Sequence, residues 1–124
     1  MDNLATLKNY LLARPAAEET YPFGPDAMVF KVMGKMFAIV VERGDEIHIN
    51  LKCDPDEALA LRDIFTSIKP GYHMNKKHWN TVYIPGDVPD GELMRMIDGS
   101  YQLVVKGLTV ALRKQLRARV GSDD

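Results

Sequence analysis

Apolar residues recur along the chain with two different periods, one typical of helices and one typical of strands. The first helix is predicted from three leucines at helical spacing: Leu4, Leu7 and Leu11. Asp2 or Asn3 can cap its start, because either side chain can accept a hydrogen bond from the first free backbone N–H groups. Pro15 disfavours a helical residue before it, so the helix should end there. Residues 18–25 contain two prolines and a glycine, and are expected to form a loop.

Three strands are predicted next. Residues 28–33 and 36–42 are apolar runs separated by Gly34-Lys35, which favours a two-residue hairpin turn of type II′ with glycine first. Residues 46–53 alternate strictly, which is typical of a strand with one buried and one solvated face. The apolar positions of this strand are Ile47, Ile49, Leu51 and Cys53.

The second helix begins with a capping box, formed by Asp54 at the cap, Pro55 at the first helical position and Glu57 three residues after the cap. Its apolar stripe follows at helical spacing: Leu61, Ile64, Phe65 and Ile68. We expect this stripe to bury the apolar face of the strand 46–52.

The rest of the chain predicts two more extended segments and two helices. Residues 69–77 are turn-rich and extended, and residues 80–84 form a clear strand. A helix over residues 89–106 should bury Leu93, Met96, Ile97, Tyr101 and Val104. Gly99-Ser100 in its middle costs about 1 kcal/mol of helix propensity, which indicates close packing there. Gly107 is expected to end the helix, and Thr109 to cap a short basic helix that runs to about residue 119.

The predicted fold is an α+β two-layer sandwich, an antiparallel sheet with helices on one face, in the order α-β-β-β-α-β-β-α plus a short last helix. Residues 1–120 should form a single domain, and residues 121–124 a disordered tail. The chain has 124 residues, 46% of them hydrophobic and 27% charged, which are ordinary globular values. One cysteine, no signal peptide pattern and no long apolar run together favour a cytoplasmic protein without a membrane partner.

The net charge is −1, so the chain as a whole has no general attraction for nucleic acid. The basic residues are nevertheless unevenly distributed. Residues 69–81 contain three lysines and two histidines without an acid, and residues 106–120 contain five basic residues without an acid. A neutral chain of this kind can still present a basic face.

Two segments resemble those of the MmcQ/YjbR family. Residues 68–82 read Ile-Lys-Pro-Gly-Tyr-His-Met-Asn-Lys-Lys-His-Trp-Asn-Thr-Val, and residues 96–101 read Met-Ile-Asp-Gly-Ser-Tyr, followed by Leu-Val-Val-Lys-Gly-Leu at 103–108. Element order and length also match, so the resemblance covers residues 1 to 120. It implies a fold described as CyaY-like or secretion-chaperone-like, and a DNA-binding role through a double-wing arrangement. Gly99 departs from the family pattern, since similar proteins often carry a larger, helix-favouring residue there.

We therefore predict a non-catalytic DNA-binding protein that holds duplex DNA weakly and non-specifically. Lysines and arginines contact phosphates, histidine can donate to them, and tryptophan can stack on a base. The predicted contacts are Lys69, Lys76, Lys77, His78, Trp79, Arg113 and Arg117. In the alternative interpretation, Trp79 fills the edge of the core and the lysines form a solvated turn. The basic helix at the end of the chain can equally be an ordinary solvated helix.

Two other functions remain open. The fold implied by the resemblance is also used to bind protein segments, so a protein-interaction or chaperone-like module, monomeric or homodimeric, is the main alternative. A small-molecule-binding domain or enzyme would need a deep pocket near Tyr72, His73, His78 and Trp79. The exposed face of the sheet separates the first two hypotheses, because an apolar face favours a protein partner and a basic rim favours nucleic acid.

No metal, cofactor or catalytic residue is predicted. The three histidines do not share a helix face with another ligand, and the acidic ridge needed for CyaY-like iron binding is missing, since Asp2 is the sole acid before Glu18. Cys53 follows an apolar strand position, so we expect a buried structural thiol. Pairs of acids such as Asp54 and Glu57 are explained by helix capping.

Overall fold

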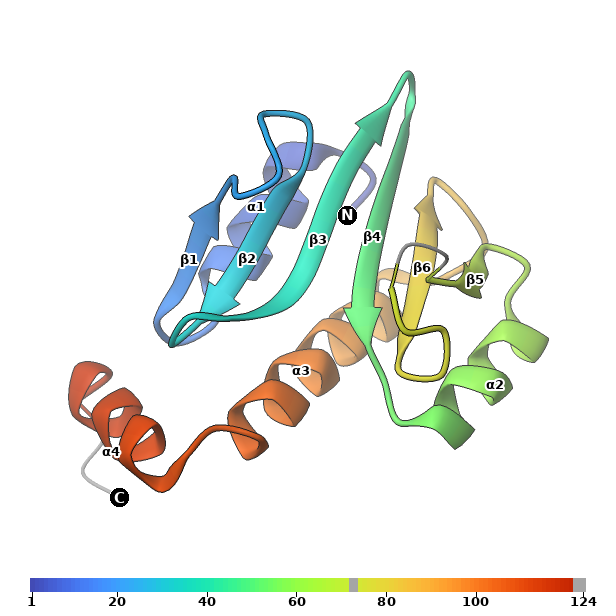
Figure 1. Cartoon of the computed structure of the whole chain (residues 1–124). Coiled ribbons are helices and arrows are strands. Elements are labelled where there is room, and N and C mark those ends of the chain that lie inside the picture. Colours follow the sequence, from blue (N-terminus) through green and yellow to red (C-terminus); the bar gives the residue numbers. More distant parts are fainter. Residues whose placement is uncertain (72–73, 122–124) are drawn as a thin grey trace.

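In the computed structural model, which describes residues 1–71 and 74–121, the strands form one antiparallel sheet (Figure 1). Within the described residues it has six strands in the order β1-β2-β3-β4-β6-β5. The strands are β1 (Ala17–Thr20), β2 (Met28–Val32), β3 (Lys35–Arg43), β4 (Glu46–Lys52), β5 (Ile68–Pro70) and β6 (Trp79–Ile84). The helices are α1 (Leu4–Leu12), α2 (Pro55–Ile64), α3 (Asp90–Lys106) and α4 (Val110–Arg119). The predicted α+β class with an antiparallel sheet is confirmed.

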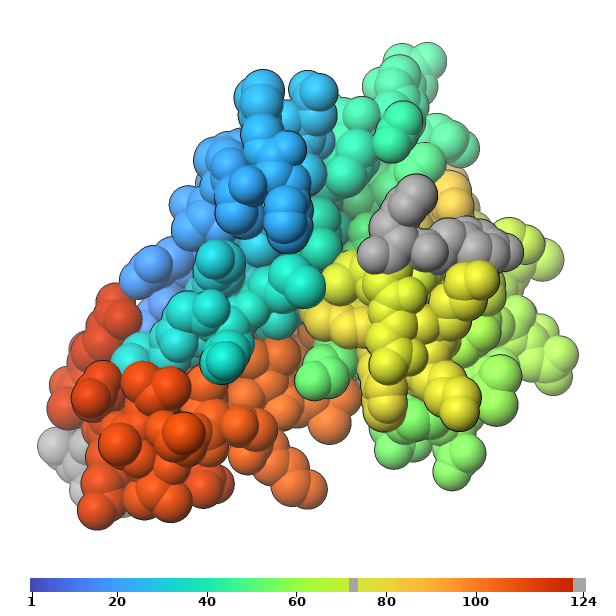
Figure 2. All heavy atoms as spheres, viewed as in Figure 1, coloured from blue at the N-terminus to red at the C-terminus, as the bar shows by residue number. Residues whose placement is uncertain are grey.

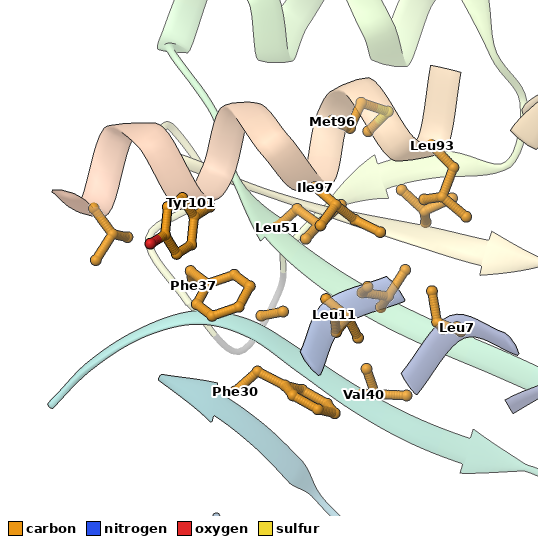
Figure 3. Packing of buried hydrophobic residues seen from close by; sticks show 14 of the residues in the cluster. Leu7, Leu11, Phe30, Phe37, Val40, Leu51, Leu93, Met96, Ile97 and Tyr101 are labelled. Carbon is orange, nitrogen blue, oxygen red and sulfur yellow. The ribbon is translucent and has the colours of Figure 1, made fainter. Parts of the chain in front are cut away.

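The core lies between the sheet and the two helices α1 and α3 (Figure 3). Leu7 and Leu11 of α1 and Ile97 of α3 have no exposed surface, and they share one apolar cluster with Phe30 and Val40 of the sheet. The predicted inward side of α3 is confirmed, because every one of its five predicted residues is buried. At the end of this core, the rings of Phe37 and Tyr101 meet edge to face at 5.4 Å.

The strand β1 was not predicted, and the expectation of a loop over residues 18–25 is wrong for its first part. Ala17 pairs with Val32 and Thr20 with Val29, so β1 extends the sheet beyond β2. Its sequence, Ala-Glu-Glu-Thr, contains residues that are depleted in strands and shows no clear alternation of burial. An edge strand of this kind is stabilised by pairing with its neighbour more than by its own side chains, and its charges discourage further pairing.

The β2–β3 turn also differs from the prediction. Val32 pairs with Lys35, so the two turn residues are Met33 and Gly34, and both have positive φ angles of 49° and 82°. Positive φ at both positions is typical of a type I′ turn, whereas a type II′ turn over Gly34-Lys35 was expected. The turn therefore begins one residue earlier than the apolar pattern indicates.

The helix α2 ends earlier than predicted and covers a different part of the sheet. Phe65 already has an extended backbone and Ile68 belongs to β5, so Leu61 alone is a buried helical member of the predicted stripe. Phe65 and Ile68 still reach the core from outside the helix, whereas Ile64 is 66% exposed. The carboxylate of Asp87 accepts hydrogen bonds from the N–H groups of Thr66 and Ser67 at 2.8 and 2.9 Å. These bonds stabilise the turn that follows the helix.

The apolar face of β4 is buried as predicted, but under another helix. Ile47, Ile49 and Leu51 are at most 6% exposed. It is α3 that packs on β3 and β4, while α2 packs on β5 and β6. Asp54 is confirmed as the N-cap of α2, since its side chain accepts from the N–H groups of Asp56 and Glu57. The Glu57 carboxylate pairs with Arg95 at 2.8 Å instead of completing the predicted capping box.

The ends of the other helices follow the sequence closely. Asn3 caps α1 by accepting from Thr6 N–H, and Thr109 caps α4 by accepting from Leu112 N–H. Gly107 is the C-cap of α3, with an ordinary right-handed φ of −82°. The predicted disordered tail lies outside the described residues except for Gly121. None of the helices within the described ranges is both long and apolar enough to cross a membrane.

Candidate nucleic-acid interface

The segment predicted to act as a wing is the loop between β5 and β6, which we call the wing loop (residues 71–78, with 72 and 73 outside the described residues). The two strands that carry it pair in a short antiparallel ladder, Ile68 with Val82 and Pro70 with Asn80. Gly71 extends the ladder by donating its N–H to the carbonyl oxygen of Trp79 at 2.9 Å. A Cβ atom at Gly71 would lie 3.0 Å from that of Trp79, so the close approach favours glycine here.

Two neighbouring elements hold the backbone of the wing loop in place. The Arg62 guanidinium of α2 donates to the Lys76 carbonyl oxygen at 2.9 Å and to the Ala58 carbonyl oxygen at 3.2 Å. On the other side, the N–H of Cys53 donates to the carbonyl oxygen of His78 at 2.7 Å. Within the loop, the Asn75 side chain accepts from a backbone N–H at 3.0 Å. The loop is therefore anchored through its backbone, and the side chains of Lys76 and Lys77 are exposed.

The predicted contact residues of this segment differ in their exposure. Lys69, Lys76 and Lys77 are exposed, and His78 is partly buried. Trp79 is only 8% exposed, so its indole offers little surface on which a base could stack. The alternative interpretation, in which Trp79 fills the edge of the core, matches this placement better than the stacking role does.

The face of the sheet beneath Lys69 is polar around β4 and β6. Lys69 pairs with Thr81, and the Thr81 hydroxyl donates to the Asn50 side chain at 2.6 Å. One step along the same face, the rings of His48 and Tyr83 lie 4.3 Å apart. These side chains point away from α1 and α3, since their strand neighbours are the residues that enter the core.

The predicted arginines of α4 lie away from the wing loop. Arg117 is exposed and Arg113 partly buried, and α4 lies beside the β1 and β2 end of the sheet, opposite the end that carries α2, β5 and the wing loop (Figure 1). Arg119 anchors it there by an ion pair with Glu18 at 3.5 Å and a contact with the Met33 sulfur at 3.6 Å. The β2–β3 turn and part of α3 separate the two basic regions in the space-filling view (Figure 2). The structure therefore does not join the seven predicted residues into one patch.

A second feature, which the sequence did not predict, is a pocket of about 230 Å³ between α3, the start of α2 and the end of β4. We call it the α2–α3 pocket. Its lining is formed by Leu51, Lys52, Cys53, Asp54, Glu57, Asn80, Arg95, Met96, Gly99, Gln102, Leu103 and Lys106. Six of these residues lie on one face of α3 at helical spacing, but no motif or spacing in the sequence connects α3 with the other three elements. Gly99, which is unfavourable inside a helix, was the one sequence feature that drew attention to this part of α3.

The polar groups of the α2–α3 pocket do not form an activated nucleophile. Burial raises the pKa of the Cys53 thiol to about 11, and the carboxylates of Glu57 and Asp54 add to the effect. The thiol is therefore protonated at neutral pH. Arg95 is paired with Glu57 at 2.8 Å and with Glu92, and these carboxylates raise the pKa of the guanidinium further. Across the described residues, no three side chains of His, Cys, Asp or Glu are grouped so that they could hold a metal ion.

Comparison with known proteins identifies relatives along nearly the whole chain. The family model described as YjbR matches residues 12–103. The chain is 46% identical to the protein YbdF of Escherichia coli O157:H7 over 116 residues, covering 94% of this chain and 93% of that protein. It is 35% identical to YjbR of Escherichia coli K12 over 113 residues, covering 91% and 96% of the two chains.

Solved structures give the same result. The crystal structure of protein DR2400 of Deinococcus radiodurans matches with a TM-score of 0.87 and 40% identity, covering 94% of this chain and 88% of that one. A crystal structure of a Pseudomonas syringae protein matches with a TM-score of 0.72 and 30% identity, covering 82% and 97%. The resemblance inferred from residues 68–82 and 96–108 is thus confirmed, and the chain belongs to the YjbR family.

Proposed function

We propose that the chain is a non-catalytic DNA-binding module whose wing loop contacts the phosphates of duplex DNA. The observation that carries the proposal is the anchored backbone of this loop, which presents Lys76 and Lys77 at the surface. Lys69 lies at the foot of the same loop on β5. Charged side chains on a pre-positioned backbone bind phosphates with less loss of conformational freedom than charges on an unrestrained segment.

The open face of the sheet is polar over β4 and β6, next to Lys69, whereas over β3 it carries the partly exposed Ile39 and Val41. The polar part of this face favours the proposal over a protein-interaction module. A partner segment that docks on a sheet needs an apolar surface, whereas the face next to Lys69 carries the Asn50–Thr81 and His48–Tyr83 contacts. Polar side chains of this kind can donate to phosphate oxygens. Arg113 and Arg117 lie on α4, at the opposite end of the sheet from the wing loop (Figure 1). We therefore leave them out of the proposed interface.

Binding of this type is expected to be weak and independent of sequence. Without base contacts, Kd should be on the order of 10⁻⁴ to 10⁻⁶ M at physiological salt. Three lysine–phosphate contacts predict a slope of log K against log salt of about −3, from roughly −0.9 per contact.

The experiment is fluorescence anisotropy with a labelled duplex over a salt series. Lys76→Ala combined with Lys77→Ala should reduce the magnitude of the slope by about 2. A matched control, Arg43→Ala with Lys106→Ala, removes the same charge from exposed positions outside the wing loop and should leave the slope near its wild-type value. Absence of binding at low salt, or equal slopes for both double variants, would contradict the proposal.

A further inference from the structure

The α2–α3 pocket combines an apolar wall with lysine side chains. Leu51 of β4 and Met96 of α3 are at most 6% exposed, and together with Leu103 they provide the apolar wall. Lys52 and Lys106 line the same pocket, the first partly buried and the second exposed. An apolar group and a charged group of one small molecule therefore both find matching side chains here.

The two lysines are the cations of the pocket that have no counter-charge. Within the described residues, neither Lys52 nor Lys106 forms an ion pair. The third cation of the lining, Arg95, is paired with Glu57 at 2.8 Å and also with Glu92. An anionic ligand can therefore be bound by the lysines without breaking an existing ion pair.

We infer that the α2–α3 pocket binds a small carboxylate with an apolar body of one or two rings. Lys52 and Lys106 bind the carboxylate, and the apolar body packs against Leu51, Met96 and Leu103. This site is separate from the lysines of the wing loop, and the inference does not depend on the proposed DNA contact.

The donors around the pocket favour a carboxylate over a phosphate. Phosphates are commonly bound by the free N–H groups of a helix N-terminus. At the start of α2 the carboxylate of Asp54 already accepts from the N–H groups of Asp56 and Glu57, at 3.2 and 3.4 Å. A dianionic phosphate would find no free donors there and would be repelled by Asp54. A carboxylate carries one charge and can be bound by lysine side chains alone.

The size of the pocket limits the apolar body to about two rings. Its volume is about 230 Å³, whereas an apolar cavity of about 150 Å³ is enough for benzene and drug-sized ligands occupy about 300–1,000 Å³. Gly99 leaves the α3 side of the pocket open, because a Cβ atom there would meet nothing within 4 Å.

The probes 2-naphthoate and 2-naphthamide have nearly the same shape, and only the first is charged. In a ¹H–¹⁵N NMR titration of the full chain, both should shift the amide signals of Cys53 and Gln102. Naphthoate should bind about tenfold more tightly at low salt, since one exposed ion pair contributes up to about fivefold. High salt should weaken naphthoate and leave naphthamide unchanged. Acetate, which lacks the apolar body, should not shift these signals at concentrations that saturate the site with naphthoate.

A double variant of the lysines tests which charges recognise the ligand. In Lys52→Gln combined with Lys106→Gln, the preference for naphthoate over naphthamide should fall to less than about twofold. Lys35→Gln combined with Lys114→Gln is the matched control, because both lysines are exposed and neither lines the pocket. It removes the same charge from the chain and should keep the tenfold preference.

Two glycine variants of α3 test the location of the site without altering its charges. Gly99→Met should fill the pocket and abolish binding of both probes. Gly91→Met is the control on the same helix, because a Cβ atom at Gly91 also meets nothing and this residue does not line the pocket. It should bind both probes as the wild type does.

Three results would overturn the inference. One is that naphthoate does not shift the pocket signals, or that acetate shifts them equally well. The second is that the two double lysine variants show the same preference for naphthoate, which would mean that Lys52 and Lys106 do not recognise the carboxylate. The third is that Gly99→Met binds naphthoate as tightly as Gly91→Met, which would place the binding site elsewhere.

Discussion

The hydroxyl of Ser100 donates a hydrogen bond to the carbonyl oxygen of Phe37 across 2.6 Å. The same hydroxyl accepts a hydrogen bond from the backbone N–H of Lys52 at 2.8 Å. Ala38 and Leu51 form the last pair between β3 and β4, so Phe37 and Lys52 lie just beyond the ladder. One buried side chain of α3 thus bonds the backbones of two strands where they cease to pair with each other.

This relationship predicts that Ser100→Ala destabilises the fold by roughly 1–3 kcal/mol, because it removes the partner of two backbone groups next to the core. Gly99→Ala is the neighbouring control. Its added methyl group meets no atom within 4 Å, and alanine should raise the free energy of unfolding by up to about 1 kcal/mol through helix propensity. Urea denaturation followed by circular dichroism measures both changes. Equal stability of Ser100→Ala and the wild type would show that these hydrogen bonds contribute nothing net.

The Gly99-Ser100 pair also shows what the sequence could predict of this structure and what it could not. The cost of Gly99 in a helix correctly indicated a special packing site, but the close contact is made by Ser100, and Gly99 itself is exposed. Helix and strand positions with strong periodicity, such as those of α3 and β4, were predicted well. Periodicity shows which face of a helix or strand is buried, but it does not show which other element covers that face.

The partner of each buried face could not be predicted in the same way. The apolar faces of β4 and α2 were expected to meet, yet β4 packs under α3. β1 was missed because an edge strand of polar residues has no apolar alternation to detect. The lining of the α2–α3 pocket includes Cys53, Asn80 and Gly99, which are far apart in the sequence and share no spacing rule.

Gly71 tests whether the close contact with Trp79 positions the wing loop. A Cβ atom at Gly71 would lie 3.0 Å from the Trp79 Cβ and 3.1 Å from its carbonyl oxygen, so Gly71→Ala should force the two segments apart. We expect a loss of stability of about 1–3 kcal/mol, in the range of overpacked interiors. Trp79 is the only tryptophan of the chain, so its fluorescence should shift to the red as water gains access. Gly91→Ala, where the added atom meets nothing, should leave both readouts near wild type.

Cys53 should react slowly with alkylating agents in the native state. With a pKa of about 11, its thiolate fraction at pH 8 is about two hundred times lower than that of an ordinary thiol. The greater nucleophilicity of a more basic thiolate recovers about a factor of ten, so alkylation should be about twenty times slower than in the unfolded chain. Mass spectrometry after iodoacetamide treatment, with and without urea, measures the ratio. Cys53 is only partly buried, in contrast to the buried thiol that the sequence predicted, and equal rates in the two states would contradict the raised pKa of its thiol.

Asp87 predicts a specific contribution to acid sensitivity. Hydrogen bonds from the Ser67 hydroxyl and backbone and from Thr66 hold the pKa of its carboxyl well below the usual value of about 3.9. A carboxyl whose pKa is lower in the folded state stabilises the fold above the unfolded pKa, and this contribution is lost as the pH falls below it. Asp87→Asn should therefore lower the melting temperature at neutral pH, and the difference from the wild type should shrink as the pH falls from about 5 towards 2.

The control for this prediction is Asp45→Asn in the exposed β3–β4 turn, which removes the same charge without breaking the turn after α2. Thermal unfolding followed by circular dichroism at several pH values compares the two variants with the wild type. The Asp45 variant should follow the wild-type curve at every pH, whereas the Asp87 variant should approach it only in acid. If the Asp87 variant stays equally far below the wild type at pH 2 and pH 7, its effect comes from the shape of the turn, and the ionised carboxylate contributes nothing specific.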